Sequence, residues 1–262
     1  MVWARAYDGG AMAELTDAEL ARYARQLILP EVDLEGQSRL KRGRVLIIGG
    51  GGLGTPIAQY LAGAGVGVIR IADNDHIELS NLPRQLAYTE QDVGQFKVDV
   101  LARRLVEGNP GVAVDARVTR FDSGSAPSLL EDIDLVLDAT DSLQARLDID
   151  RATFAAGLPW VMGAAVRTSG QWAAFDGGRE QGCYHCLVAD ADQIQEAGCA
   201  KLGILGPVVG LVALQQSLLA LKYLLGANVP WGQLRLLDAW SGEHHDITIG
   251  ARKNCLMCQN ER

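Results

Sequence analysis

A short strand, a glycine-rich turn and an apolar helix follow one another directly near residue 50. The run 44–48 is rich in β-branched residues, the next six residues include five glycines, and 57–64 is apolar. Gly49, Gly51 and Gly54 satisfy the spacing G-x-G-x-x-G, which lets a backbone turn approach phosphate groups at a helix N-terminus. This arrangement predicts a parallel α/β fold that binds a nucleotide at the carboxyl ends of its strands.

The pattern beyond this turn alternates strands with helices and then changes near residue 169. Strands are expected at 66–72, 113–121, 135–139 and 160–166, with helices at 98–106 and 143–156. Later strands are expected at 171–175, 234–240 and 246–249, with one long helix at 203–225. Strands joined by helices form parallel sheets, whereas strands without such crossovers pair antiparallel. We therefore predict a Rossmann-like α/β fold: a mainly parallel sheet flanked by helices, with antiparallel strands added in the C-terminal half.

The N-terminal region has two further expected helices. Apolar residues recur at helical spacing between Leu15 and Ile28, after the N-cap candidate Thr16, and a second short helix is expected at 32–40. Residues 1–14 are expected to form a flexible tail. No repeat or low-complexity linker divides the rest, so we expect residues 15–262 to form a single domain.

The charge and the apolar segments exclude several kinds of partner. The formal net charge is −8, which disfavours binding to nucleic acid or to an anionic membrane surface. The most apolar stretch, 203–225, contains Pro207, Gln215, Gln216 and Lys222, so it is interpreted as a buried helix rather than a membrane span. The first twenty residues lack the pattern of a secretory signal, and five cysteines are too few for a disulfide scaffold. We expect a cytoplasmic protein.

Polar residues gather after the strands that end near residues 72 and 139. They are Asp73, Asp75, Asn81, Arg84, Lys97 and Asp141. Because ligands of open α/β sheets bind beyond the carboxyl ends of the strands, these side chains could face one crevice. Cations beside carboxylates suit a nucleoside triphosphate with Mg²⁺. Taken singly, each has a simpler explanation: Arg84 and Lys97 as surface charges, and Asp141 as the N-cap of the following helix.

These residues resemble the motifs of the MoeB/ThiF/HesA sulfur-carrier adenylyltransferases, which are relatives of the ubiquitin-activating enzymes. The resemblance covers about Leu15 to Cys258. Its matching segments are Arg22 to Gln26, Gly49 to Gly54, Asp73 to Asp75, Ser80 to Gln85, Lys97, Asp138 to Asp141, and two Cys-x-x-Cys pairs. The family commonly has Gln where Pro83 stands and Asn where Ser142 stands, which leaves the identity of the substrate open.

The resemblance implies an activity and a role for each motif. A ThiF-type enzyme adenylates the C-terminal glycine carboxylate of a small ubiquitin-like protein that ends in Gly-Gly, releases pyrophosphate, and prepares the carrier for thiocarboxylate formation in molybdopterin or thiamine synthesis. The implied nucleotide-binding residues are Gly49, Gly51, Gly52, Gly54, Asp73 (ribose), Asp75, Asn81, Arg84, Gln85, Lys97 and Asp141 (through Mg²⁺). Arg25 would act with Arg84, Lys97 and Asp141 in catalysis by reaching into the site of a second subunit of a homodimer. A separate cysteine desulfurase or rhodanese would supply the sulfur.

Four of the five cysteines form two Cys-x-x-Cys pairs, Cys183/Cys186 and Cys255/Cys258. Four thiolates suffice for a tetrahedral structural Zn²⁺, but the wide separation of the pairs leaves redox-active or unligated thiols open. The resemblance implies that the pairs bind one zinc ion. His185, between two of the cysteines, is expected to face solvent.

Cys199 is the unpaired cysteine, and it precedes the long apolar helix. A helix N-terminus favours the thiolate form, so nucleophilic reactivity is plausible on physical grounds. Some relatives use a cysteine here for a covalent link to the activated carrier, whereas others release the adenylate, so both roles stay open. If the role is covalent, Cys199→Ala should leave ATP–pyrophosphate exchange intact.

Three other functions remain to be weighed. A nicotinamide-dependent oxidoreductase would explain the glycine turn and Asp73, but not Arg84, Lys97 and Asp141. A relative could adenylate a tRNA base or a peptide carboxylate. A non-catalytic binding module would be favoured by the loss of these three residues, and all three are present.

Overall fold

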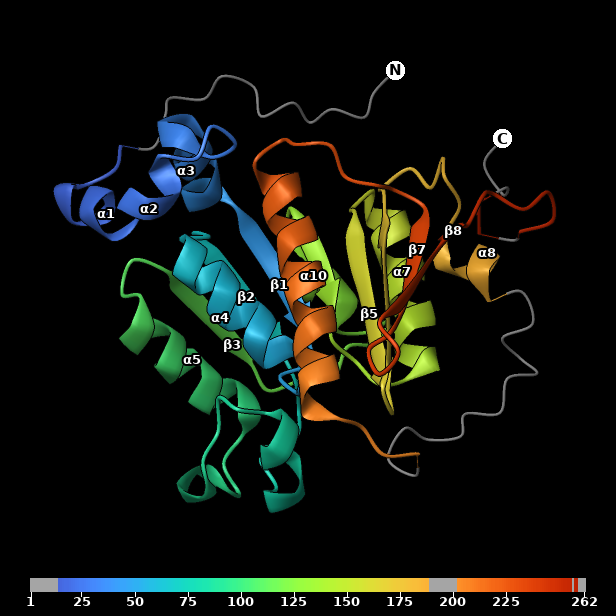
Figure 1. The fold of residues 1–262 in the computed structure, drawn as a ribbon, viewed down its shortest axis with the longest axis horizontal. Coiled ribbons are helices and arrows are strands. Elements are labelled where there is room, and N and C mark those ends of the chain that lie inside the picture. Colours follow the sequence, from blue (N-terminus) through green and yellow to red (C-terminus); the bar gives the residue numbers. More distant parts are fainter. Residues whose placement is uncertain (1–13, 189–201, 256, 259–262) are drawn as a thin grey trace.

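The structure is a computed structural model that describes residues 14–188, 202–255 and 257–258 (Figure 1). The expected tail therefore lies outside the described residues except for Glu14. Cys199 also lies outside them.

The described residues form an eight-stranded sheet in the order β3-β2-β1-β4-β5-β6-β7-β8. The strands are β1 (Arg44–Ile48), β2 (Val68–Ala72), β3 (Ala113–Arg117), β4 (Leu135–Asp138), β5 (Trp160–Val166), β6 (Ser169–Phe175), β7 (Gln233–Asp238) and β8 (Glu243–Thr248). The first five pair in parallel, and β6, β7 and β8 are added antiparallel. The predicted Rossmann-like α/β fold with antiparallel C-terminal strands is confirmed.

The helices are close to the predicted ones, with instructive differences at the N-terminus. They are α1 (Asp17–Arg22), α2 (Ala24–Leu27), α3 (Asp33–Arg42), α4 (Gly54–Ala64), α5 (Lys97–Gly108), α6 (Ala126–Leu130), α7 (Leu143–Ala156), α8 (Tyr184–Leu187) and α10 (Gly206–Leu224), with the 3-10 turns η1 (Leu79–Arg84) and η2 (Glu90–Asp92). The helix expected between Leu15 and Ile28 is broken at Tyr23, whose buried hydroxyl accepts a hydrogen bond from Asn109. Thr16 is the N-cap of α1 and forms a capping box with Glu19.

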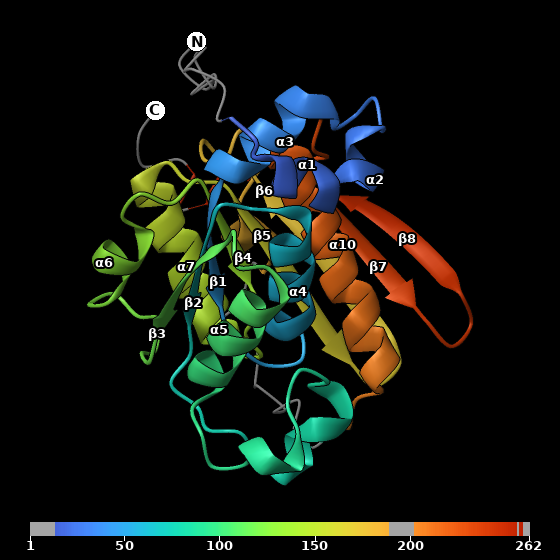
Figure 2. The ribbon, with the colours of Figure 1, turned by 90° about the vertical axis from the view of Figure 1, so that its left-hand side faces the viewer.

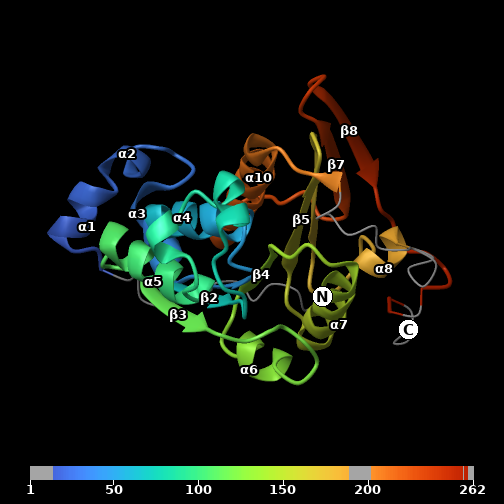
Figure 3. The ribbon, with the colours of Figure 1, turned by 90° about the horizontal axis from the view of Figure 1, so that it is seen from below.

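Helices cover both faces of the sheet. Figures 1 and 2 show α4, α5 and α10 on one face, and Figure 3 shows α7 on the other. Side chains of β1 alternate between the two cores: Val45 and Ile47 pack under α4, α5 and α10, while Leu46 and Ile48 pack with the α6 and α7 side. Both faces of β1 are thus buried, as in central strands of α/β proteins.

Helix α10 is long and apolar enough, by length and composition, to span a membrane. Half of its most apolar stretch is buried, and it packs against α4, β5 and β6. It is therefore a core helix of this fold.

Candidate functional site

The carboxyl ends of β1, β2 and β4 lie level with one another. Ile48 of β1 pairs with Ala72 on one side and with Asp138 on the other. The chain leaves β1 toward β2 and later crosses to β4 on the opposite side, so β1 and β4 flank a topological switch point. The glycine loop lies at this edge of the sheet (lower part of Figure 1), which is where open α/β sheets bind their ligands.

Two glycines of the loop are required by steric contacts. Gly49 has φ +104°, and a Cβ there would lie 2.7 Å from the carbonyl oxygen of Ala139. A Cβ at Gly54 would collide with the carbonyl of Gly49. The loop is thereby pressed against the end of β4, and α4 begins directly after it with no side-chain cap on its first turn. An uncapped helix start after a glycine loop suits an anionic group.

Asp73, at the end of β2, holds the loop from the other side. Its carboxylate accepts hydrogen bonds from the backbone N–H of Gly50 at 2.6 Å and of Asp75 at 2.7 Å. Burial raises the pKa of Asp73, although the positive charge of Lys97 and these two N–H donors oppose the rise.

Lys97 begins α5 and is buried beside the loop. Its Nζ lies 2.7 Å from the carboxylate of Asp75, and its Cβ would be 3.3 Å from a Cβ placed on Gly50. The hydroxyl of Tyr88 lies 2.7 Å from the carbonyl oxygen of Gly50 and 3.2 Å from that of Lys97. Burial raises the pKa of Tyr88, so it is a permanent hydrogen-bond donor here. The sequence analysis did not identify Tyr88, because no spacing marks it.

Arg84 reaches the loop from η1. A Cβ on Gly52 would lie 3.5 Å from Arg84 Cγ, and the guanidinium donates to Asn81 Oδ1 at 2.9 Å and to the carbonyl of Ser80 at 3.1 Å. Among the described residues, Arg84 has no carboxylate partner. Its positive charge is therefore oriented by neutral groups and remains available to an anion. Pro83, one of the departures from the family, is exposed in η1.

Two buried polar atoms beside the loop have no partner among the described residues. They are Thr55 Oγ1, in the first turn of α4, and Gln85 Oε1. The amide nitrogen of Gln85 would be 3.5 Å from a Cβ on Gly51, so this side chain lies against the loop. Buried polar groups are normally satisfied, and unsatisfied ones at a glycine loop indicate a site for a polar ligand.

Asp141 lies in the loop that follows β4. Ala139, two residues earlier, abuts Gly49, and the Asp141 side chain is exposed. The N-cap of α7 is Ser142, whose hydroxyl accepts from the N–H of Ala145 at 3.2 Å, so the alternative that Asp141 caps this helix is wrong. The structure thus brings Arg84, Lys97 and the Asp141 loop to one edge of the sheet.

A buried ion pair that the sequence did not reveal fixes this loop. Asp138 is fully buried and accepts from Thr140 and from Arg146 Nε at 3.0 Å. Burial raises the pKa of Asp138, against the opposing effect of the Arg146 charge. Arg146 also donates to the carbonyl of Thr140 at 2.8 Å. The sequence predicted only that Arg146 lies in a helix. Its partner, Asp138, could not be predicted because tertiary packing brings the two side chains together.

Arg25 is not near this edge in its own chain. It is exposed on α2, and the neighbouring Gln26 donates to the carbonyl of Ala64, the last residue of α4. The glycine loop precedes the first residue of α4, about 16 Å away along the helix axis. Arg25, on α2, therefore lies at the opposite end of α4 from the glycine loop. We call the carboxyl ends of β1, β2 and β4, together with this loop, the nucleotide edge (lower part of Figure 1).

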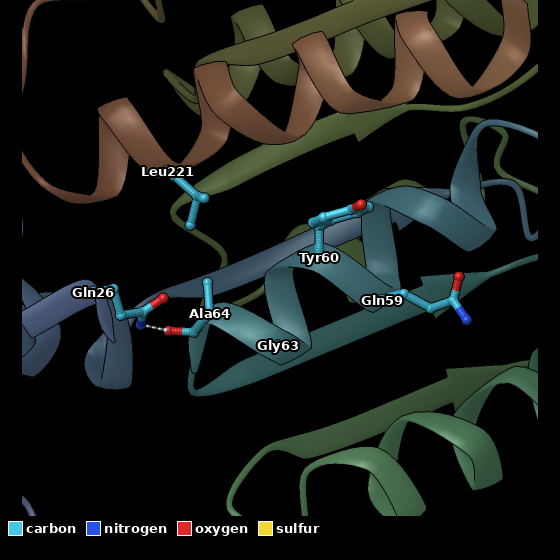
Figure 4. Close-up of a pocket in the computed structure, with 6 residues that line it drawn as sticks. All are labelled: Gln26, Gln59, Tyr60, Gly63, Ala64 and Leu221. Carbon is cyan, nitrogen blue, oxygen red and sulfur yellow. Dashed lines mark hydrogen bonds between the residues drawn. The ribbon is translucent and has the colours of Figure 1, made fainter. Parts of the chain in front are cut away.

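A surface cavity of about 400 Å³ lies near Arg25 rather than near the glycine loop. Figure 4 shows that its lining comes from three helices: Gln26 of α2, Leu221 of α10, and Gln59, Tyr60, Gly63 and Ala64 of α4. Exposed apolar residues of α10 continue on the helix surface, namely Leu211, Leu214 and Leu218. Among the described residues, the lining of this cavity contains no charged side chain.

The four paired cysteines form one compact cluster. Their sulfur atoms all lie within 4.8 Å of one another, with Cys183–Cys186 at 3.8 Å, Cys183–Cys255 at 3.6 Å and Cys186–Cys258 at 3.6 Å. A tetrahedron of Zn–S bonds of about 2.3 Å has edges of about 3.8 Å. The cluster therefore fits a tetrathiolate metal site and brings the two pairs together.

His185 differs from the expectation that it faces solvent. Its ring is half-buried, and Nδ1 lies 2.7 Å from the carboxylate of Asp150 on α7. Burial alone would lower the pKa of His185, but the hydrogen bond to Asp150 and the contact with Cys183 outweigh it and raise the pKa to about 9. The expectation was wrong because the partner, Asp150, is 35 positions away in the sequence.

The fold and this edge define a class of protein: an α/β protein with a glycine loop at the carboxyl ends of its parallel strands, cationic side chains beside that loop, and a separate cysteine cluster. The profile of the ThiF family matches residues 23–259, and the chain belongs to this family. The match covers nearly all described elements, including both sites.

Two named relatives are similar to this chain over almost their whole length. The chain is 39% identical over 244 residues to the sulfur carrier protein ThiS adenylyltransferase of Escherichia coli K12, covering 93% of this chain and 97% of the relative. It is 37% identical over 248 residues to the molybdopterin-synthase adenylyltransferase of the same organism, covering 94% and 99%. A solved structure of E. coli MccB with MccA-N7isoASN has a TM-score of 0.79 at 23% identity, covering 90% of this chain and 74% of that one. This last likeness shows the fold.

Proposed function

We propose that this protein is an adenylyltransferase that uses ATP to activate the C-terminal glycine carboxylate of a small ubiquitin-like sulfur-carrier protein ending in Gly-Gly. The observation that carries the proposal is that the guanidinium of Arg84, which has no carboxylate partner among the described residues, and the buried Lys97 both lie against the glycine loop. The names of the relatives give the reaction class, and the nicotinamide alternative is not favoured.

The proposed reaction requires stabilisation of charge more than proton transfer. The carrier carboxylate is ionised at neutral pH and attacks the α-phosphorus, so the P–O bond to the departing pyrophosphate breaks while the acyl–AMP bond forms. Negative charge builds on the nonbridging oxygens and on pyrophosphate. Asn81, Arg84 and Lys97 would bind the phosphates, and the carboxylate of Asp73 would accept from the ribose hydroxyls.

A magnesium ion fits the carboxylates of this edge. Asp141 is exposed in the loop that follows β4, and carboxylate oxygens are the ligands that Mg²⁺ prefers. When bound, the ion would neutralise phosphate charge in the ground state and on the leaving group. Gly49, Gly51, Gly52 and Gly54 would keep the backbone close to the phosphates, with Asp75 and Gln85 at the rim.

Arg25 supports a homodimer in which each site is completed by the partner. It lies too far from its own glycine loop to act there, and the apolar face of α4 and α10 beside it offers a surface for a second copy (Figure 4). In such a dimer Arg25 would add a cation to the other subunit's triphosphate.

The remaining assignments complete this proposal. The cysteine cluster would hold a structural Zn²⁺, since four thiolates leave no open position for a substrate. Residues 15–262 would be a single ThiF-type domain in the cytoplasm. A separate cysteine desulfurase or rhodanese would supply the sulfur. Cys199 could form a covalent link to the carrier if its thiolate attacks the activated carbonyl and displaces AMP.

Mass spectrometry of candidate carriers incubated with the protein and ATP–Mg²⁺ tests the reaction. We expect the mass of an adenylate on the carrier, together with ATP–pyrophosphate exchange that depends on the carrier. A carrier that lacks its final glycine is the matched control and should give neither signal. Absence of both signals with every Gly-Gly carrier would contradict the proposal, and binding of NAD in place of ATP would favour the oxidoreductase.

A further inference from the structure

Asp150 is a fully buried carboxylate on α7, far from the glycine loop. Four donors surround it. Arg179 Nε at 3.2 Å and the indole nitrogen of Trp160 at 3.3 Å donate to Oδ1, while the backbone N–H of His185 at 3.3 Å and its ring Nδ1 at 2.7 Å donate to Oδ2. Burying a carboxylate is costly unless it is paired, so this carboxylate needs all of these partners.

Arg179 ties this carboxylate to two other elements. Its side chain is 1% exposed, and it donates to Thr153 Oγ1 of α7 at 2.7 Å and to the carbonyl of Asp176, just after β6. The residue has φ +57°, so its backbone sits in a turn that few residues adopt. The ion pair therefore locks the turn that follows β6 onto α7.

His185 connects the carboxylate of Asp150 to the cysteine cluster by a hydrogen bond. It lies between Cys183 and Cys186 on α8, which packs against α7 (Figures 1 and 3). The atoms of Asp150, Cys183 and His185 that could ligate a metal lie within 4.8 Å of one another. Because one carboxylate oxygen accepts both the backbone and the ring of His185, it fixes this residue in two directions at once.

The C-terminal cysteines are fastened to the same turn. The backbone N–H of Arg252 points at Cys186 Sγ at 3.4 Å, and its guanidinium donates to the carbonyl of His185 at 2.9 Å. Both sides of the turn between Cys183 and Cys186 are therefore held by hydrogen bonds.

We propose that Asp150, held by Arg179, is a positioning residue for the metal centre and fixes His185 so that the sulfur atoms of Cys183 and Cys186 are preoriented. The inference rests on the zinc site of the proposed function. Groups that hydrogen-bond around metal ligands typically change metal affinity about 10- to 100-fold when they are removed. A preoriented pair of sulfurs reduces the conformational entropy that is lost on binding.

The test is the rate at which zinc passes from the purified full-length protein to a chromogenic chelator. We expect His185→Leu and Asp150→Asn to release zinc about 10-fold faster or more than wild type. His185→Asn, which can present an amide N–H near the place of Nδ1, should restore most of the slow release. Asp148→Asn is the matched control, since Asp148 lies on the same helix and its carboxylate contacts only the exposed face of that helix, through Arg151 and Gln144; it should release zinc at the wild-type rate.

Two further readouts separate a metal-directed role from packing. Co²⁺-substituted His185→Leu should keep the visible spectrum of a tetrathiolate site, which shows that the four ligands remain. Urea unfolding should show a larger loss of stability for His185→Leu in the metal-loaded protein than in the metal-free protein. Equal losses in both forms, or wild-type release rates for His185→Leu, would overturn the inference, and neither result needs Asp150→Asn to fold.

A failure of the proposed zinc site can be distinguished from a failure of the inference about Asp150 and His185. Wild-type protein that is purified without bound metal and fails to take up Zn²⁺ or Co²⁺ would overturn both the zinc site and this inference. Tight metal binding with no effect of His185 substitution would overturn the inference alone.

Discussion

The nucleotide edge and the cysteine cluster are assembled in different ways. At the nucleotide edge, Asp73, Lys97 and the Asp138–Asp141 loop come from the ends of neighbouring parallel elements, and Gly49 joins them by direct backbone contact. At the cysteine cluster, pairs that are 72 positions apart meet only because the antiparallel strands return the C-terminal segment to α8. The nucleotide edge follows from a strand order that sequence motifs predict. The cysteine cluster depends on contacts between segments that are far apart in the sequence.

The largest effect is expected from substitutions at the nucleotide edge that leave the cysteine cluster unchanged. Arg84→Ala or Lys97→Ala should lower the rate of ATP–pyrophosphate exchange about 10²- to 10³-fold, because each removes a fixed cation from the transition state. Thermal unfolding should change little for Arg84, which is held only by neutral partners. Arg103→Ala on α5 removes an exposed cation and is the control, expected to stay within about 2-fold of wild type. A loss below 5-fold for both variants would remove these residues from the proposed site.

The second prediction tests whether the nucleotide edge needs another subunit. Arg25→Ala and Lys97→Ala proteins should each be nearly inactive. After mixing and subunit exchange, about a quarter of wild-type activity should return, because half of the dimers are mixed and each of these has one complete site. Recovery measured by pyrophosphate exchange supports sharing across the interface. If the mixture stays as inactive as its parts, Arg25 acts within its own chain or not at all.

The third prediction disrupts the cysteine cluster and leaves the other region in place. Cys183→Ser, or removal of the metal by a chelator, should lower the free energy of unfolding by about 2–4 kcal/mol, because the C-terminal segment loses its anchor. The affinity for ATP should stay within about 3-fold of wild type, since the contacts of the cluster among the described residues do not include Arg84, Lys97 or Asp141. Calorimetry and nucleotide titration on the same sample measure both. Parallel loss of ATP binding would show that the two regions are coupled.

The smallest effect is expected from a test of the steric requirement for glycine at position 49. Gly49→Ala forces a left-handed backbone and a clash with Ala139, so we expect about 1–3 kcal/mol of destabilisation. Gly210→Ala, within α10 with open space around it, is the matched glycine and should be neutral or stabilising by up to about 1 kcal/mol. Urea unfolding compares the two. Equal effects would mean that the loop tolerates a Cβ at Gly49.

The sequence predicted the parallel half more fully than the antiparallel half. β1, β5 and α7 have the predicted bounds, because buried β-branched runs and a 3.6-residue periodicity are local signals. β8 was expected at 246–249 but begins at Glu243, since every residue of this edge strand is exposed and no apolar alternation marks its start. The short helix α6 was missed because five residues carry too little periodicity.

Candidate site residues divide in the same way. Asp73, Arg84 and Lys97 were predicted because they follow a strand that ends beside the glycine turn and match motifs of the family, and their roles stay predictions. Tyr88, Arg146 and Asp150 were not found, because each acts through a hydrogen bond to a residue chosen by packing.

The amino-acid sequence by itself determined the parallel α/β core, the glycine loop and the motifs around it, because strand periodicity and the G-x-G-x-x-G spacing are local features of consecutive residues. Only the tertiary structure decided that Arg25 lies away from its own glycine loop, that four cysteines converge, and that His185 turns to Asp150 instead of solvent. Those outcomes depend on which distant surfaces pack together, and burial of a charged group then selects its partner by proximity rather than by position in the chain.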